Sequence, residues 1–205
     1  MGGPTLNRLI IIGASGHGKV VADIARLNGY TDIVFLDDNE ELKTCAGYSV
    51  LGSVSMIDEL DGDMFVAVGN ATIRKRLMER YSYREFPVLV HPKAVVADSV
   101  KLGKGTVVMA GAVINPDTTI GQGCIINTSS SVDHDCVISE YVHVSVGAHI
   151  AGTVTIGKCT WVGAGAILSN NISVCENCMI GAGAVVVNDI AEEGTYTGVP
   201  ARNNK

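Results

Sequence analysis

The chain has 205 residues, of which 47% are hydrophobic and 18% are charged, so it can bury a sizeable core and fold as one or two domains. The formal net charge is -6 at pH 7 and no long run of Lys or Arg occurs, which argues against a surface built for nucleic acid or for an anionic membrane. No apolar stretch is long enough to span a membrane and the first residues lack an export pattern, so we expect a cytoplasmic protein.

The first 85 residues alternate between strand and helix patterns. Periodicity and turn residues predict a strand at residues 9–12, a glycine-rich turn at 13–19, a helix at 20–28, strands at 33–36 and 64–68, and a helix at 71–81. We expect the last helix to carry Arg74, Lys75 and Arg76 on its exposed side. This order indicates an α/β, Rossmann-like domain over residues 1–85, with the turn and the strand ends at one edge of a parallel sheet.

The turn from Gly13 to Lys19 has three glycines between a strand and a helix, where backbone amides can hold phosphate. It matches the pattern G-x-x-x-x-G-K, but Val20 stands where a hydroxyl residue would hold magnesium, which argues against an ATPase. It also approaches a dinucleotide fingerprint, yet the glycine spacing differs and the short domain suits a mononucleotide better. A turn that merely joins strand to helix is the alternative.

Three further features lie at the same predicted sheet edge. Asp37 and Asp38 end the second strand, and they could accept hydrogen bonds from a base or a ribose or belong to a solvated turn; the spacing leaves both open. Gly69 and Asn70 end the third strand and could approach a ligand there. For Arg74 we favour an exposed helix face over a contact with a diphosphate.

Every sixth residue from Val90 to Val186 is aliphatic, and small residues such as Ala112 and Cys124 follow four places later. This period predicts a parallel β-helix in which each six-residue unit supplies one short strand and one corner. We expect the β-helix over residues 86–190 and a tail, residues 191–205, that caps its open strand edges. Three of the six cysteines take small inward positions, so neither a disulfide framework nor a metal site is expected.

Three of the five histidines, His134, His143 and His149, lie close together in the repeat. In the sixfold frame His134 and His143 face outward, and Asp133 and Asp135 flank His134. Carboxylates beside an outward imidazole can fix its tautomer and raise its pKa, as a general base requires. Two solvated surface histidines are the alternative, and the residues alone favour it.

Several short motifs together give the chain a resemblance to the hexapeptide-repeat acyltransferases, in the branch of bacillosamine N-acetyltransferase and the sialic acid O-acetyltransferases. The motifs are residues 13–18 (GASGHG), 35–38 (FLDD), 69–70 (GN), 127–138 (NTSSSVDHDCVI), 143–145 (HVS) and 198–201 (GVPA). The resemblance implies a left-handed parallel β-helix, a homotrimer, and acetyl-CoA bound in the groove between neighbouring β-helices.

The resemblance also implies site residues. The catalytic base falls on His134 and its acidic partner on Asp135, where close relatives often have Glu. Contacts to acetyl-CoA fall on Asn127, His143, Gly152, Ala164 and Ala182, and contacts to a nucleotide sugar fall on Ser15, Gly16, His17, Asp37, Asp38 and Gly69.

The activity implied is direct transfer of acetyl from acetyl-CoA to the amino group of a nucleotide-linked amino sugar, which we expect to be a 4-amino-4,6-dideoxyhexose. No metal and no acyl-enzyme are expected; Asn127 or a backbone amide would hold the developing oxyanion. The alternatives are an O-acetyltransferase acting on a sialic acid or related sugar and a non-catalytic β-helix that binds a nucleotide.

Overall fold

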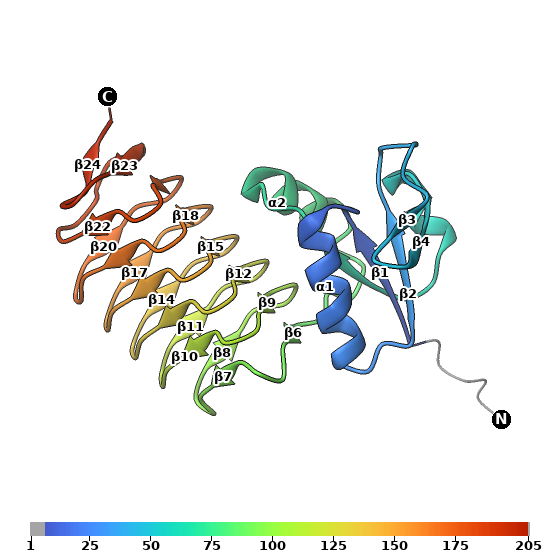
Figure 1. The fold of residues 1–205 in the computed structure, drawn as a ribbon, viewed down its shortest axis with the longest axis horizontal. Coiled ribbons are helices and arrows are strands. Elements are labelled where there is room, and N and C mark those ends of the chain that lie inside the picture. The colour runs from blue at the N-terminus through green and yellow to red at the C-terminus, as the bar shows by residue number, and fades with distance from the viewer. Residues whose placement is uncertain (1–6, 205) are drawn as a thin grey trace. The chain divides into compact units, whose positions relative to one another are not determined.

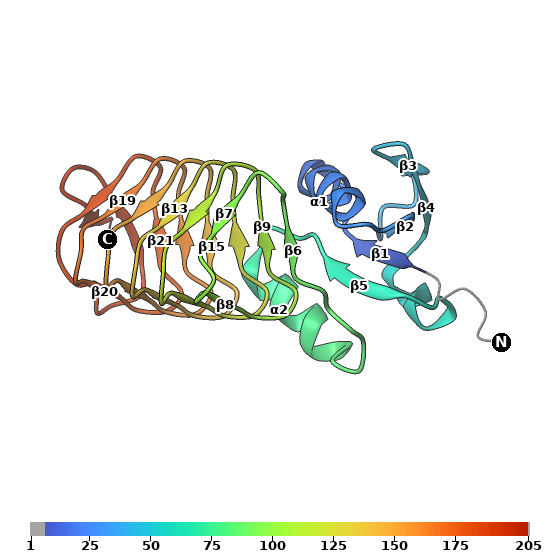
Figure 2. The same cartoon turned by 90° about the horizontal axis from the view of Figure 1, so that it is seen from below.

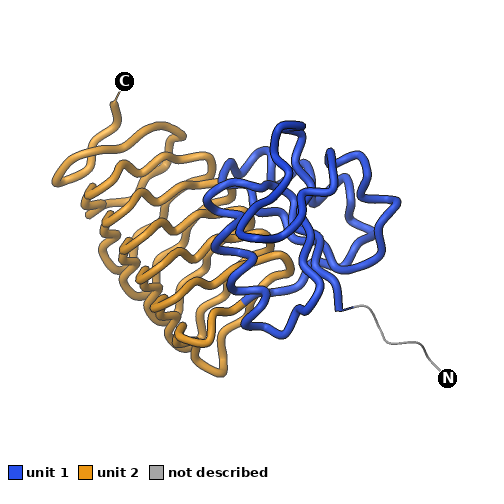
Figure 3. The backbone as a smooth tube through the Cα atoms, turned by 45° about the vertical axis from the view of Figure 1, so that its right-hand side comes forward, with its two compact units in different colours: residues 1–89 blue, residues 90–205 orange. Residues whose placement is uncertain are grey.

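The computed structural model describes residues 7–204, which form two compact units, one up to Leu89 and one from Val90 onward (Figure 3). No helix in this part of the chain is long and apolar enough to cross a membrane.

The first unit is an α/β fold around a sheet with the strand order β3-β4-β2-β1-β5. Its strands are β1 (Arg8–Ile12), β2 (Asp32–Leu36), β3 (Thr44–Cys45), β4 (Tyr48–Gly52) and β5 (Asp63–Val66). All neighbours pair in parallel except β3 and β4. The helices are α1 (Gly16–Leu27), the short 3₁₀-helix η1 (Val54–Glu59) and α2 (Ala71–Arg80) (Figure 1). The predicted α/β architecture is thus confirmed, and β1, β2 and β5 end at one edge of the sheet.

Helix α1 begins earlier than its sequence predicts. Residues 16–19, expected in the turn, form its first helical turn, and Ser15 is the N-cap. A Cβ on Gly18 would lie 2.2 Å from the carbonyl oxygen of Gly13, so only glycine lets the helix start this close to the turn. The prediction was wrong because helix propensity penalises glycine and does not register this packing.

The second unit is a parallel β-helix of about six coils, each of which passes through three faces in rotation (Figures 1 and 2). The first strand, β6 (Leu89–Val90), lies at the junction between the units. Face 1 contains β9 (Val107–Val108), β12 (Ile125–Ile126), β15 (His143–Val144), β18 (Trp161–Val162) and β21 (Met179–Ile180). Face 2 contains β7 (Val95–Val96), β10 (Val113–Ile114), β13 (Ser131–Val132), β16 (His149–Ile150), β19 (Ile167–Leu168) and β22 (Val185–Val186). Face 3 contains β8 (Lys101–Leu102), β11 (Thr119–Ile120), β14 (Val137–Ile138), β17 (Thr155–Ile156) and β20 (Ser173–Val174).

The core of the β-helix is the aliphatic column that the sixfold period predicts. From Val108 to Val186 each of these side chains is at most 2% exposed, and the small residues between them, including Cys124 and Cys136, are also buried. Strands pair with the strand one coil, or 18 residues, away; Ser131, for example, pairs with His149. Outward positions therefore stack in columns, which decides which polar side chains can meet.

After the last regular coil the chain changes direction. Strand β23 (Thr195–Thr197) continues face 1 by pairing in parallel with β21, and β24 (Arg202–Asn203) then pairs antiparallel with β23.

Candidate active site

The turn at the end of β1 is held by a carboxylate from β2. The backbone N–H of Ala14 donates to Asp37 Oδ2 (2.7 Å), while Asn39 N–H donates to Asp37 Oδ1 (2.9 Å). This places Ser15, Gly16 and His17 at the N-terminus of α1 beside the end of β2. Both oxygens of Asp37 are thereby committed to the protein backbone, so its geometry is that of a residue that shapes the turn.

The edge where β1, β2 and β5 end is hollowed by two adjoining cavities of about 190 and 390 Å³. Both are lined by Asp38, Val54, Arg76 and Leu77, and the smaller one reaches Gly13 and Asp37. Asp38 Oδ1 accepts from the N–H of Val54 (3.0 Å), and no described residue bonds to its other oxygen. Ser15, Gly16, His17 and Gly69 belong to the same edge but not to the cavity lining.

Arg74 is the side chain of this edge that differs from expectation. Arg74 is 1% exposed and donates to the carbonyl oxygens of Val68 (2.7 Å) and Gly69 (2.9 Å), so the predicted exposed position was wrong. Burial, with the charge of Arg74 as a lesser cause, lowers the pKa of His17 to about 4, so His17 is neutral at pH 7.

His134 stands at the corner between faces 2 and 3, directly after β13. Its Nδ1 lies 2.8 Å from Asp135 Oδ2, and both side chains are more than half exposed. Because a carboxylate only accepts, Nδ1 carries the hydrogen, which leaves the lone pair of Nε2 free in the neutral ring. A Cβ on Gly152, one coil further, would lie 2.7 Å from Nε2 and 2.8 Å from Cε1, so the imidazole rests on a glycine.

The surroundings of His134 favour its protonated form. The hydrogen bond to Asp135 raises the pKa of His134 most, and the charge of Asp133 raises it further. Asp135 holds its place through a left-handed backbone (φ 57°) and an N–H bond to the carbonyl of Pro116 (3.1 Å). An accessible imidazole with a fixed tautomer and raised pKa has the properties of a general base.

A second group lies at the corner between faces 1 and 2. Asn127 Nδ2 donates to His143 Nε2 (3.1 Å), and the His143 ring stacks on Trp161 with centroids 4.9 Å apart. Trp161 in turn donates from Nε1 to Ser145 Oγ (2.6 Å). His143 is only 8% exposed, so its outward position is covered by packing.

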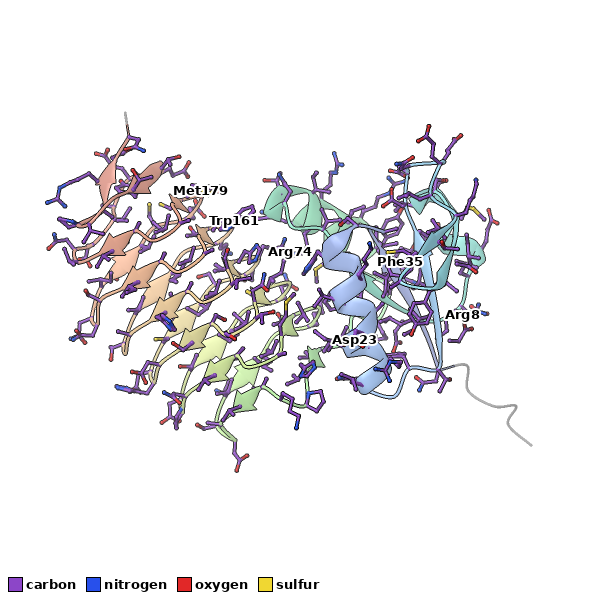
Figure 4. The ribbon with its side chains drawn as sticks, viewed as in Figure 1. Arg8, Asp23, Phe35, Arg74, Trp161 and Met179 are labelled. Atoms are coloured by element: carbon purple, nitrogen blue, oxygen red, sulfur yellow. The ribbon has the colours of Figure 1, made fainter. Side chains whose placement is uncertain are left out.

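The surface beside this group is apolar and shallow. Ala164 and Ala182 are exposed on successive coils of the same corner, joined by the bond from Gly183 N–H to Ala164 O (2.9 Å). Trp161 and Met179 are neighbouring strand partners there, 37% and 41% exposed (Figure 4). Methyl side chains and carbonyl edges along a corner fit the pantetheine arm of acetyl-CoA, which needs a shallow groove with backbone partners.

The predicted site residues thus separate into groups. His134, Asp135 and Gly152 meet at one end of β13, while Asn127, His143, Ala164 and Ala182 gather at the corner before it. Gly152, which we expect to contact acetyl-CoA, lies against the imidazole of His134. Among residues 7–204 no cluster of three or more His, Cys, Asp or Glu could hold a metal ion.

Trp161 and Ser145 were missed by sequence reasoning, although a signal for Trp161 existed. A coil of 18 residues places position 161 beside His143, as it places Gly152 beside His134. Adding 18 to the residue number of each candidate identifies both contacts, His143 with Trp161 and His134 with Gly152.

The fold and these groups define a hexapeptide-repeat acyltransferase that carries an N-terminal α/β unit. Residues 8–81 match the PglD N-terminal domain family. The acetyltransferase domain of PglB from Neisseria gonorrhoeae is 41% identical, with a TM-score of 0.93 over 96% of this chain and 99% of that one. The same domain in complex with acetyl coenzyme A gives a TM-score of 0.94 at 40% identity, over 97% of this chain and 100% of that one.

Two more enzymes extend the likeness. PerB from Caulobacter crescentus, solved with CoA and GDP-perosamine, is 34% identical with a TM-score of 0.91, over 96% of this chain and 97% of that one. UDP-N-acetylbacillosamine N-acetyltransferase of Bacillus subtilis (strain 168) is 36% identical over 114 residues, which span 51% of this chain and 52% of that enzyme, about half of each. The chain belongs to this family of nucleotide-sugar N-acetyltransferases.

Proposed function

We propose that this protein transfers the acetyl group of acetyl-CoA to the amino group of a nucleotide-linked amino sugar, a 4-amino-4,6-dideoxyhexose. The observation that carries the proposal is the exposed His134 imidazole, whose Nδ1 is bonded to Asp135 and whose Nε2 is free above Gly152. The relatives solved with acetyl coenzyme A and with CoA and GDP-perosamine support the choice of substrates.

The residues act as follows in this proposal. Acetyl-CoA, when bound, supplies the acetyl group as an activated thioester. His134 Nε2 takes the proton from the amine as the amine nitrogen bonds to the thioester carbon, and Asp135 stabilises the imidazolium that results. The C–S bond then breaks, and the imidazolium returns its proton to the departing CoA thiolate. The Asn127 side-chain amide, held by His143 and Thr128, donates to the carbonyl oxygen on which charge develops. The α1 N-terminus, Asp38 and Gly69 of the first unit hold the nucleotide, with Asp37 and His17 shaping that site.

A homotrimer completes the proposal. The Asn127 and His143 group and the His134 group lie at opposite ends of β13, and no described contact joins them. A neighbouring copy packed along face 2 would bring its Asn127 corner to the His134 corner of this copy. The exposed Val95 and Ile167 on face 2 support such packing, since they are 63% and 42% accessible in the single chain. The cytoplasm, where acetyl-CoA and nucleotide sugars are made, stays the predicted location.

The test is release of free CoA thiol with a panel of UDP-, GDP- and dTDP-linked 4-amino sugars, and with their 4-hydroxy counterparts and sialic acids as controls. We expect turnover with one amino sugar and none with the hydroxyl acceptors. Turnover confined to hydroxyl acceptors would make the protein an O-acetyltransferase, and no turnover with any acceptor would contradict the proposal.

His134→Ala tests the base. We expect kcat to fall about a hundredfold or more while acetyl-CoA still binds, because proton transfer and not cofactor binding is lost. Steady-state kinetics and calorimetric titration of acetyl-CoA measure the two effects. A variant with near-normal turnover would remove His134 from the mechanism.

A further inference from the structure

The carboxylate of Asp133 joins two neighbouring coils at the corner that carries His134. Its Oδ1 accepts one hydrogen bond from Asn115 Nδ2 (2.7 Å) and another from the backbone N–H of His134 (2.8 Å). Asn115 lies 18 residues earlier, in the same outward column one coil back. The backbones of both residues are fixed by the strand ladder, through bonds from Asn115 N–H to Val132 O (2.9 Å) and from Asp133 N–H to Ile150 O (3.0 Å).

These bonds keep Asp133 ionised beside the base. The Asn115 side chain, followed by the His134 backbone N–H, lowers the pKa of Asp133. Few other charges face His134: its own coil supplies Asp133 and Asp135, the coil before supplies Asp117, and the corner of the coil after, at Gly152 and Thr153, carries none. The hydrogen bond between Asp135 and His134 joins two exposed side chains, and a pair of this kind is loosely held in water.

We propose that Asn115 and Asp133 are a positioning pair for His134: Asn115 holds the Asp133 carboxylate, which fixes the backbone of the base and stabilises its imidazolium. Asp135 then sets the tautomer through Nδ1, while Asp133 acts through its charge and the His134 backbone N–H without occupying a ring nitrogen. Only the kinetic consequences of this proposal rest on the proposed function. The position and basicity of the ring are properties of the free protein.

Three variants separate the parts of the pair. Asp133→Asn removes the charge and keeps an oxygen that can accept both hydrogen bonds, whereas Asn115→Ala keeps the charge and removes its anchor. Asp117→Asn is the matched control, because it removes a carboxylate one coil away that bonds to neither His134 nor Asp133. The pKa of His134 is followed by NMR titration of its ring in the intact protein, and the other histidines report whether the fold is retained.

We expect Asp133→Asn to lower the pKa of His134 by about half a unit, the size of one charge several ångströms away near a wet surface. The acidic limb of the kcat/KM profile should move down with it, and kcat should fall about tenfold at unchanged KM. Asn115→Ala should lower kcat by a similar factor with a smaller change in the pKa of His134, because the Asp133 carboxylate keeps its charge but loses its fixed position. Asp117→Asn should match the wild type in both measurements.

The proposal is overturned if Asp133→Asn leaves the pKa of His134 where it was, or if Asp117→Asn lowers it equally. Full activity of Asn115→Ala removes Asn115 from the pair. A wild-type protein that acetylates no nucleotide sugar would defeat the proposed function, but the NMR titration would still decide whether Asp133 controls the imidazole.

Discussion

The imidazole of His134 has room for its working position only because residue 152 has no side chain. In Gly152→Ala the new methyl group would lie 2.7 Å from Nε2, closer than such atoms approach, so the ring must swing away. The backbone of Gly152 has no left-handed φ, so the alanine itself is tolerated. We expect kcat to fall about tenfold to a hundredfold, because a misplaced base loses the geometry of proton transfer.

Stability separates this effect from a folding defect. The ring is the free end of an exposed side chain, so the free energy of unfolding should change by about 1 kcal/mol or less. Asn170→Ala is the control, since Asn170 is exposed one coil beyond Gly152 in the same column and forms no described hydrogen bond with His134 or Asp135. Urea unfolding and steady-state kinetics on both variants decide the matter; a Gly152→Ala enzyme with wild-type kcat would show that the imidazole does not act from its observed position.

Among the elements, the turn between β1 and α1 depends on Asp37 as well as on its glycines. Asp37→Ala removes the acceptors of two backbone N–H groups, and we expect it to destabilise the first unit by about 1–3 kcal/mol and to weaken nucleotide binding. Asp38→Ala removes one bond at an exposed position and should weaken nucleotide binding with little loss of stability.

Urea unfolding of each variant and calorimetric titration with UDP, GDP and dTDP measure the two effects. Equal stability of the two variants would contradict the structural role of Asp37. Unchanged nucleotide affinity in Asp38→Ala would place the ligand elsewhere.

The same region shows why some local features escape sequence reasoning. Arg74 belongs to a basic run on a helix, a pattern typical of solvated faces, yet it is buried because its guanidinium satisfies the carbonyls of Val68 and Gly69 after β5. The residue types do not reveal which backbone carbonyls will accept a hydrogen bond from a buried side chain. The strands themselves were predictable, since Leu9 to Ile12 form a continuous apolar run and all are at most 2% exposed.

At the scale of the molecule, the β-helix was the most predictable part, because one period decides both its core and its columns. The aliphatic positions from Val108 onward are buried as the period requires. The same period contains the contacts of the site: 18 residues separate Asn115 from Asp133 and His134 from Gly152. To predict that Asn127 lies beside His143 and apart from His134, the order of the three faces is needed as well. The period alone does not give that order.

Because His134 and His143 lie at separate corners of one copy, the proposed trimer can be tested without a structure of the assembly. If each site takes His134 from one copy and His143 from its neighbour, His134→Ala and His143→Ala proteins are each inactive as pure trimers. Coexpressed, they form mixed trimers in which some interfaces pair an intact His134 with an intact His143. Random mixing in equal amounts makes about one interface in four complete, so about a quarter of wild-type kcat should return. If one copy supplied both histidines, no mixture could rebuild a site and activity would stay at the level of the pure variants. Sedimentation of the mixed protein, checked for trimers by mass, confirms that the copies have combined before activity is measured.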